Sequence, residues 1–229
     1  MRLRVGLVTG ALALSLALVG CGSSTSSKTG APSTTATSST TAAPSTTVPT
    51  AAQLQARLLG AGDVGAGWQA GENITPEDLS SIAHANPCGD DKIDPAVAKR
   101  LTAVTGMQFE PADRSYEHFI ELVVTGDPTQ LDSDLHALMA DLESCPAVKD
   151  LSIPKLGDQQ AAYVMTAEES ANAVWHVRNA VVRIGPVAVV VGMTEVLPSA
   201  QATPQISDET FTKVLRTAVT KVSGSTLVP

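Results

Sequence analysis

Residues 58–68 read Leu-Leu-Gly-Ala-Gly-Asp-Val-Gly-Ala-Gly-Trp and contain the spacing G-x-G-x-x-G from Gly60 to Gly65. In a dinucleotide site this spacing follows a strand and opens a helix, so that backbone amides meet the pyrophosphate. Here a helical pattern precedes the glycines, and Val-Gly-Ala-Gly-Trp after them is a poor helix former. We therefore predict a turn-rich connection, in which Gly60 caps the preceding helix, and expect no cofactor.

The other residue types that could do chemistry form no recognisable catalytic set. The sequence has no G-x-S-x-G or H-E-x-x-H motif, and no two of its four histidines are four residues apart. His118 alternates with apolar residues, which favours a hydrogen-bonded core histidine over a catalyst. Asp90, Asp91 and Asp94 could bind Ca²⁺, but the EF-hand spacing with its terminal Glu is missing, which favours a solvated acidic loop. We predict no catalytic residue and no metal ligand, and hence a protein that is not an enzyme.

The N-terminus has the features of an export signal. Arg2 and Arg4 precede an apolar stretch, residues 5–19, that is shorter than the roughly 20 residues of a membrane-spanning helix. The following Leu-Val-Gly-Cys, residues 18–21, resembles the lipobox of bacterial lipoproteins. The resemblance implies that residues 1–20 are a cleaved signal peptide and that Cys21 is the acylated, palmitate-bearing N-terminus. The alternative is an ordinary secreted protein in which this cysteine has no such role.

The rest of the chain divides into a tether and one domain. Residues 21–50 are rich in Ser, Thr, Ala and Pro and lack carboxylates and aromatic rings, which predicts a disordered tether, either a plain spacer or O-glycosylated. Residues 51–229 have the length of a single domain. With Cys21 assigned to lipid, Cys88 and Cys145 remain, and in an exported domain such a pair predicts a disulfide. Two unrelated buried thiols are the alternative.

The charge of the domain restricts its partners. All 23 acidic residues lie in 51–229, with every basic residue except Arg2, Arg4 and Lys28, so the domain carries a formal charge of −11. No basic patch supports nucleic-acid binding, and an acidic surface gains nothing from an anionic membrane. Aromatic residues make up only 3% of the chain, which disfavours carbohydrate binding and base stacking. We expect membrane contact through the N-terminal acyl chains alone.

The hydrophobic patterns predict an α+β domain. Helices are expected over 51–59, 94–105, 127–145 and 207–223, and strands over 107–111, 115–125, 161–166, 173–184 and 187–196. Gly185-Pro186 predicts a tight hairpin, and 69–93 is predicted to be irregular. The simplest arrangement is an antiparallel sheet with helices packed mainly on one face, stabilised by one disulfide. Arg178 and Arg183 would lie on opposite faces of one strand, where either could line a cleft.

Several features together resemble secreted actinobacterial lipoproteins and, among them, the PknH-like extracellular sensor domain family. The residues that carry the resemblance are Leu58, Leu59, Asp63, Gly67, Trp68, Cys88, Cys145, Pro146 and the hairpin over 173–196. The resemblance implies an α+β fold with disulfides and a solvent cleft for an unidentified ligand. The family domain has two bridges, whereas this domain offers one pair of cysteines, and no ligand-binding residue can be carried over.

The sequence therefore predicts a lipid-anchored envelope protein on the extracytoplasmic face of the cell membrane. Its domain would bind a small ligand or a partner protein without catalysis, in the manner of a sensor. Two alternatives stay open. A carrier or chaperone for an envelope lipid or lipoglycan requires a large apolar cavity. A hydrolase with an unrecognised site requires a nucleophile within hydrogen-bonding reach of a histidine.

Overall fold

A computed structural model of the chain describes residues 48–79, 99–112, 117–170, 173–199 and 202–224. The predicted signal peptide, Cys21, nearly all of the tether, Cys88 and the Asp90–Asp94 loop lie outside these residues. The elements in chain order are α1 (Ala51–Gln55), α2 (Ala61–Val64), β1 (Trp68–Ile74), η1 (Pro76–Asp78), β2 (Ala103–Pro111), β3 (Glu117–Thr125), α5 (Pro128–Glu143), β4 (Val148–Asp150), β5 (Gln159–Ser170), β6 (Ala173–Ile184), β7 (Val187–Leu197) and α6 (Asp208–Ser223).

The described strands form one seven-stranded sheet in the order β1-β2-β3-β7-β6-β5-β4. Every neighbouring pair is antiparallel. The central pairing of β3 with β7 joins strands far apart in the chain, with Glu121 opposite Val191 in the register. This arrangement confirms the predicted α+β class and its antiparallel sheet.

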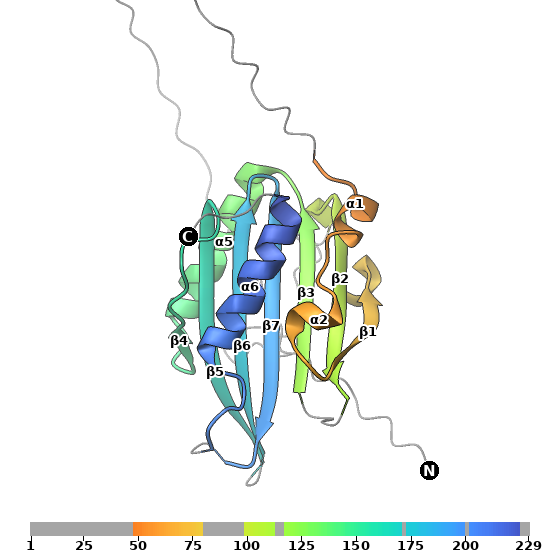
Figure 1. The fold of residues 1–229 in the computed structure, drawn as a ribbon. Helices are drawn as coiled ribbons and strands as arrows, with labels where there is room; N and C mark the ends of the chain where they lie inside the picture. The colour runs from red at the N-terminus through yellow and green to blue at the C-terminus, as the bar shows by residue number, and fades with distance from the viewer. Residues whose placement is uncertain (1–47, 80–98, 113–116, 171–172, 200–201, 225–229) are drawn as a thin grey trace, which may run out of the picture.

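Helices cover both faces of the sheet, so the prediction that they lie mainly on one face holds for α1, α2 and α6 but misses α5. Figure 1 shows α1, α2 and α6 in front of the sheet and α5 behind it. The reason lies in the central strands, which are apolar on both sides. In β3, Phe119 and Val123 pack into the cluster beneath α6, whereas Ile120 and Leu122 pack into the cluster beneath α5. Two apolar faces need two covering layers.

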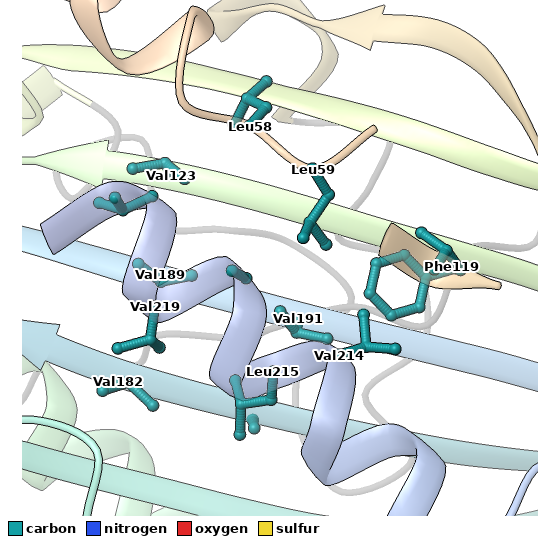
Figure 2. Packing of buried hydrophobic residues seen from close by; sticks show 14 of the residues in the cluster. Leu58, Leu59, Phe119, Val123, Val182, Val189, Val191, Val214, Leu215 and Val219 are labelled. Carbon is teal, nitrogen blue, oxygen red and sulfur yellow. The ribbon is translucent and has the colours of Figure 1, made fainter. Parts of the chain in front are cut away.

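Helix α6 and the hairpin before it match the sequence prediction closely. The buried stripe of α6 is the predicted set Phe211, Val214, Leu215, Ala218, Val219 and Val222. Ser207 is the N-cap, since its side chain accepts a hydrogen bond from the amide of Thr210, and Gly224 ends the helix in the left-handed conformation. In the β6–β7 turn, Gly185 has φ 56°, a conformation that favours glycine. Figure 2 shows the α6 stripe against Val182, Val189 and Val191 of these strands.

The N-terminal part of the domain differs from the prediction. Helix α1 ends at Gln55, and Gly60 is the N-cap of α2 instead of a C-cap. The start of the segment predicted to be irregular, 69–93, belongs to the edge strand β1, Trp68–Ile74. The helix predicted over 94–105 is wrong at its end, because β2 already begins at Ala103. Among the described residues, no helix is both long and apolar enough to span a membrane.

Candidate functional site

A cleft of about 910 Å³ runs along the first half of α6. Its described lining comes almost entirely from that helix, and each of these residues has a polar or charged group: Ser152, Asp208, Glu209, Thr210, Thr212, Lys213 and Arg216. The fold places these side chains in a simple way. The apolar stripe of α6 faces the sheet, so the remaining positions of the helix face outward.

Ser152 comes from the segment after β4, which packs beside α6. Leu151 and Ile153 contact the same apolar cluster as the α6 stripe, and Leu156 is buried in it. Ser152, between the two partly buried residues, is exposed and supplies a hydroxyl to the cleft. The cleft therefore lies along α6 on one sheet face, and its described lining residues supply hydroxyl groups and charges.

The charges of the cleft are divided along the helix. Asp208 and Glu209 lie in its first turn, where carboxylates complement the helix dipole. Lys213 and Arg216 follow within the next two turns. Within the described residues, Glu209, Lys213 and Arg216 form no ion pair. The cleft thus offers anionic and cationic side chains that are free to contact a bound molecule.

Asp208 connects the cleft to a buried ionic network. Its carboxylate accepts a hydrogen bond from Nε of Arg178 at 2.8 Å, while Nη1 of Arg178 lies 3.0 Å from Oε2 of Glu195. The side chains of Arg178 and Glu195 are only 5% and 2% exposed, whereas that of Asp208 is 63% exposed. The guanidinium therefore joins an inner carboxylate, buried in the sheet face, to an outer one in the cleft wall.

Glu195 also fixes the chain that leads into α6. Its second oxygen, Oε1, accepts hydrogen bonds from the backbone amides of Gln205 and Ile206, at 2.8 and 3.1 Å. Those residues lie immediately before the N-cap Ser207. One buried carboxylate thus sets both the position of Arg178 and the start of the helix that lines the cleft.

His176 lies on the same side of β6 as Arg178, two residues away. Burial, followed by the positive charge of Arg178, lowers the pKa of the imidazole, and Glu195 and Asp208 oppose this effect. Its Nε2 is buried without a hydrogen-bond partner among the described residues. Burial and the neighbouring guanidinium thus both favour the neutral form of the ring.

The G-x-G-x-x-G segment has a structural role beside α6. It forms the connection from α1 into α2, with α1 before the glycines, a helix of only four residues among them and β1 after them. The amide of Gly60 donates to Asp63 at 2.7 Å, and Asp63 pairs with Lys221 of α6 at 2.8 Å. The order strand, glycines, helix that a dinucleotide site needs is not found here.

The other residues singled out from the sequence are dispersed. Arg178 and Arg183 lie on opposite faces as predicted, with Arg183 pairing with Asp132 of α5 at 2.8 Å. His118 is partly buried on β3, and its Nδ1 lies 3.8 Å from Oε1 of Glu110. Cys145 is buried just beyond the end of α5. Because Cys88 lies outside the described residues, the Cys88–Cys145 disulfide stays a prediction. No cluster of three or more potential metal ligands occurs among the described residues.

Sequence reasoning missed the buried acids Glu121 and Glu195. Each interrupts an apolar run, Glu121 in Phe-Ile-Glu-Leu-Val-Val of β3 and Glu195 in Gly-Met-Thr-Glu-Val-Leu of β7. That isolation was an available signal, since a charge in the middle of a buried strand needs a partner or a function.

Comparison with known proteins gives a likeness of fold. No family model and no curated protein matches the chain. Among solved structures, the extracellular domain of PknH from Mycobacterium tuberculosis is similar, with a TM-score of 0.54 and 16% sequence identity over 77% of this chain and 98% of that chain. At this identity the likeness concerns the architecture alone. The chain thus shares the fold of an extracellular domain.

Proposed function

We propose that this chain is a lipid-anchored extracytoplasmic protein whose domain binds a small ligand or a partner protein in the α6 cleft without catalysing a reaction. The fold likeness to an extracellular domain supports the location. The Leu-Val-Gly-Cys sequence at 18–21 supports acylation of Cys21. Intact mass measurement of the mature protein tests the anchor, because it must show a diacylglyceryl group on an N-terminal cysteine.

The observation that carries the binding proposal is the polar cleft with its free charges. Glu209, Lys213 and Arg216 lie in it without ion-pair partners among the described residues. Asp208 adds a connection to the interior, because a ligand that contacts this carboxylate competes with Arg178 for it. Binding in the cleft would then change the charge balance around Glu195, which holds the start of α6.

The two alternatives fit this cleft less well. A carrier for a lipid needs an apolar cavity, whereas every residue in the lining is polar. A hydrolase needs a nucleophile beside a base, and the described lining offers the hydroxyls of Ser152, Thr210 and Thr212 without a histidine.

Native mass spectrometry of the mature protein, purified from its own cell envelope, tests ligand binding. The double substitution Lys213→Glu and Arg216→Glu reverses the cationic part of the cleft. Its matched control, Lys99→Glu with Lys149→Glu, reverses two exposed lysines outside the cleft. A bound mass should persist in the parent and the control and be lost from the cleft variant. Equal retention in both variants would place the binding elsewhere.

A further inference from the structure

Glu121 is a fully buried carboxylic acid beneath the N-terminal part of the domain. Its side chain leaves β3 on the face covered by α1, α2 and α6, and the residue is 0% exposed. Oε2 accepts a hydrogen bond from the backbone amide of Leu59 at 2.6 Å. Oε1 is buried without a hydrogen-bond partner among the described residues. The α6 cleft and its ionic network do not involve this group.

The hydrogen bond from Leu59 joins Glu121 to the α1–α2 segment, residues 51–64. This segment packs on the sheet through the buried side chains of Leu54, Leu58, Leu59 and Val64, two of which Figure 2 shows near Phe119 and Val123. Its other described side-chain contacts to the rest of the domain are few. Arg57 donates to the carbonyl of Val222 at 2.8 Å, Gln55 contacts Asn73 and Thr105, and Asp63 pairs with Lys221 at 2.8 Å. Such a short segment is a natural unit of local opening.

Few charges compensate Glu121 in its closed position. Asp63 from α2 and Lys221 from α6 face Glu121, but they pair with each other at 2.8 Å. Their opposite charges therefore have opposing effects on the pKa of Glu121, which largely cancel. Arg57, also in the segment, is directed to the end of α6. The residues opposite Glu121 on the neighbouring strands are Met107 and Val191, which carry no charge.

We propose that Glu121 is a proton-controlled latch for the α1–α2 segment, which is held closed on the sheet when this carboxyl is protonated and opens when it is ionised. This goes beyond ligand binding in the cleft and does not rest on it. The segment directly follows the predicted tether, so the latch controls how firmly the domain holds the chain that leads to its membrane anchor.

The direction of the effect follows from burial. Desolvation raises the pKa of Glu121 from its ordinary value of 4.5 to about 7, against the opposing effects of the Leu59 amide and Lys221. Opening of the segment would let water reach the unpartnered oxygen, Oε1. The open state therefore ionises near pH 4.5 and the closed state near pH 7. Between pH 4.5 and pH 7 each rise of one pH unit lowers the free energy of opening. Above pH 7 this free energy no longer changes with pH.

Hydrogen–deuterium exchange of the full mature protein tests the latch. Exchange rates of peptides from 51–64 are divided by the intrinsic rates at each pH, which gives protection factors. Protection should be about twentyfold higher at pH 5.5 than at pH 7.5. It should also lie below that of β6 and β7 amides at both values, because local opening needs less free energy than global unfolding.

Two variants separate Glu121 from other titrating groups. Glu121→Gln keeps the shape of the side chain without its charge, so protection of 51–64 should no longer depend on pH. Glu110→Gln removes an exposed carboxyl from β2 and should keep the parent's dependence. The proposal is overturned if the parent shows equal protection at both pH values or if Glu121→Gln retains the difference. Carbon-13 NMR titration of the parent decides independently of any variant, since a Glu121 carboxyl that titrates near 4.5 in the folded protein also refutes the latch.

Discussion

Arg178 has two carboxylate partners that differ in burial, which allows a matched pair of substitutions. Glu195→Gln removes the inner charge, 2% exposed, and Asp208→Asn removes the outer one, 63% exposed. Each change deletes one negative charge beside the same guanidinium and keeps the size of the side chain. The expected costs differ because the two carboxylates differ in solvation.

Glu195→Gln should lower the free energy of unfolding by about 3–5 kcal/mol, the usual cost of removing one partner of a buried pair. If the oxygen of the introduced amide keeps the contacts with the backbone amides of Gln205 and Ile206, the NH₂ group of that amide faces the Nη1 donor of Arg178. Asp208→Asn should cost only about 1 kcal/mol, since exposed ion pairs and first-turn carboxylates each contribute a fraction of that to 1 kcal/mol.

Urea unfolding followed by circular dichroism measures both costs, provided that the slope m is unchanged. The double substitution Arg178→Met with Glu195→Gln completes a cycle. It should be destabilised by about 1–3 kcal/mol less than the sum of its single substitutions, because it leaves no unpaired buried charge. Equal costs for Glu195→Gln and Asp208→Asn, or strict additivity in the cycle, would refute the description of the pair as a buried, coupled unit.

Three further predictions concern other parts of the chain. Gly62→Ala should stabilise the domain by about 0.5–1 kcal/mol in the same urea assay, because Gly62 lies in α2 with open space where the Cβ is added. Gly67→Ala should destabilise it by about 1 kcal/mol, because Gly67 has φ +84°. Thiol labelling after unfolding without reductant should find neither Cys88 nor Cys145 reactive, and reduction should remove roughly 4 kcal/mol of stability for a loop of this length. Glu121→Gln should have the parent's free energy of unfolding at pH 4.5 and exceed it by about 3 kcal/mol at pH 8. The raised pKa of Glu121 destabilises the folded parent only at pH values where the carboxyl is ionised in the unfolded state. A constant difference between variant and parent across this pH range would contradict the buried titration.

The sequence predicted best the elements in which local signals and burial agree. The β6–β7 hairpin has Val-rich strands on either side of Gly185-Pro186, and its bounds are matched within one residue. Helix α6 combines a Ser207 cap, acidic residues in its first turn and one apolar stripe, and all three are confirmed. Where propensity, capping and periodicity point to the same structure, little is left for tertiary contacts to change.

The elements that were missed lack one of these signals. Strand β1 is an edge strand whose middle residues are exposed, so Gln69, Gly71 and Asn73 show no apolar alternation. Val97, Leu101 and Val104 have helical spacing, but Val104 lies on β2 and packs into the cluster beneath α5. Pairing with the neighbouring strand outweighs the local helical pattern there.

The candidate site could be predicted only in part, because it depends on pairings between distant residues. The position of Arg178 on one face of its strand followed from alternation alone. Its pairing with Asp208 did not, since Asp208 is 30 residues away in the chain and lies on α6. Glu195 lies opposite His176 across the predicted β6–β7 hairpin, and its pairing with Arg178 was overlooked. The cleft likewise depends on the packing of Ser152 beside α6, which no local pattern encodes.

The two faces of the sheet differ in how far their buried charges lie from water. On the α5 face, Arg183 pairs with carboxylates that are 40% and 56% exposed, and buried Asp134 is paired with Arg100, whose side chain is 35% exposed. Such pairs remain close to water and need no special explanation. On the α6 face, Glu121 and the Arg178–Glu195 pair are enclosed in the apolar sheet, where well-packed hydrophobic residues are often equally or more stabilising. Packed hydrophobic residues at these positions would stabilise the fold at least as well. We therefore propose that the buried charges serve to position α6 and the α1–α2 segment, the elements that they contact.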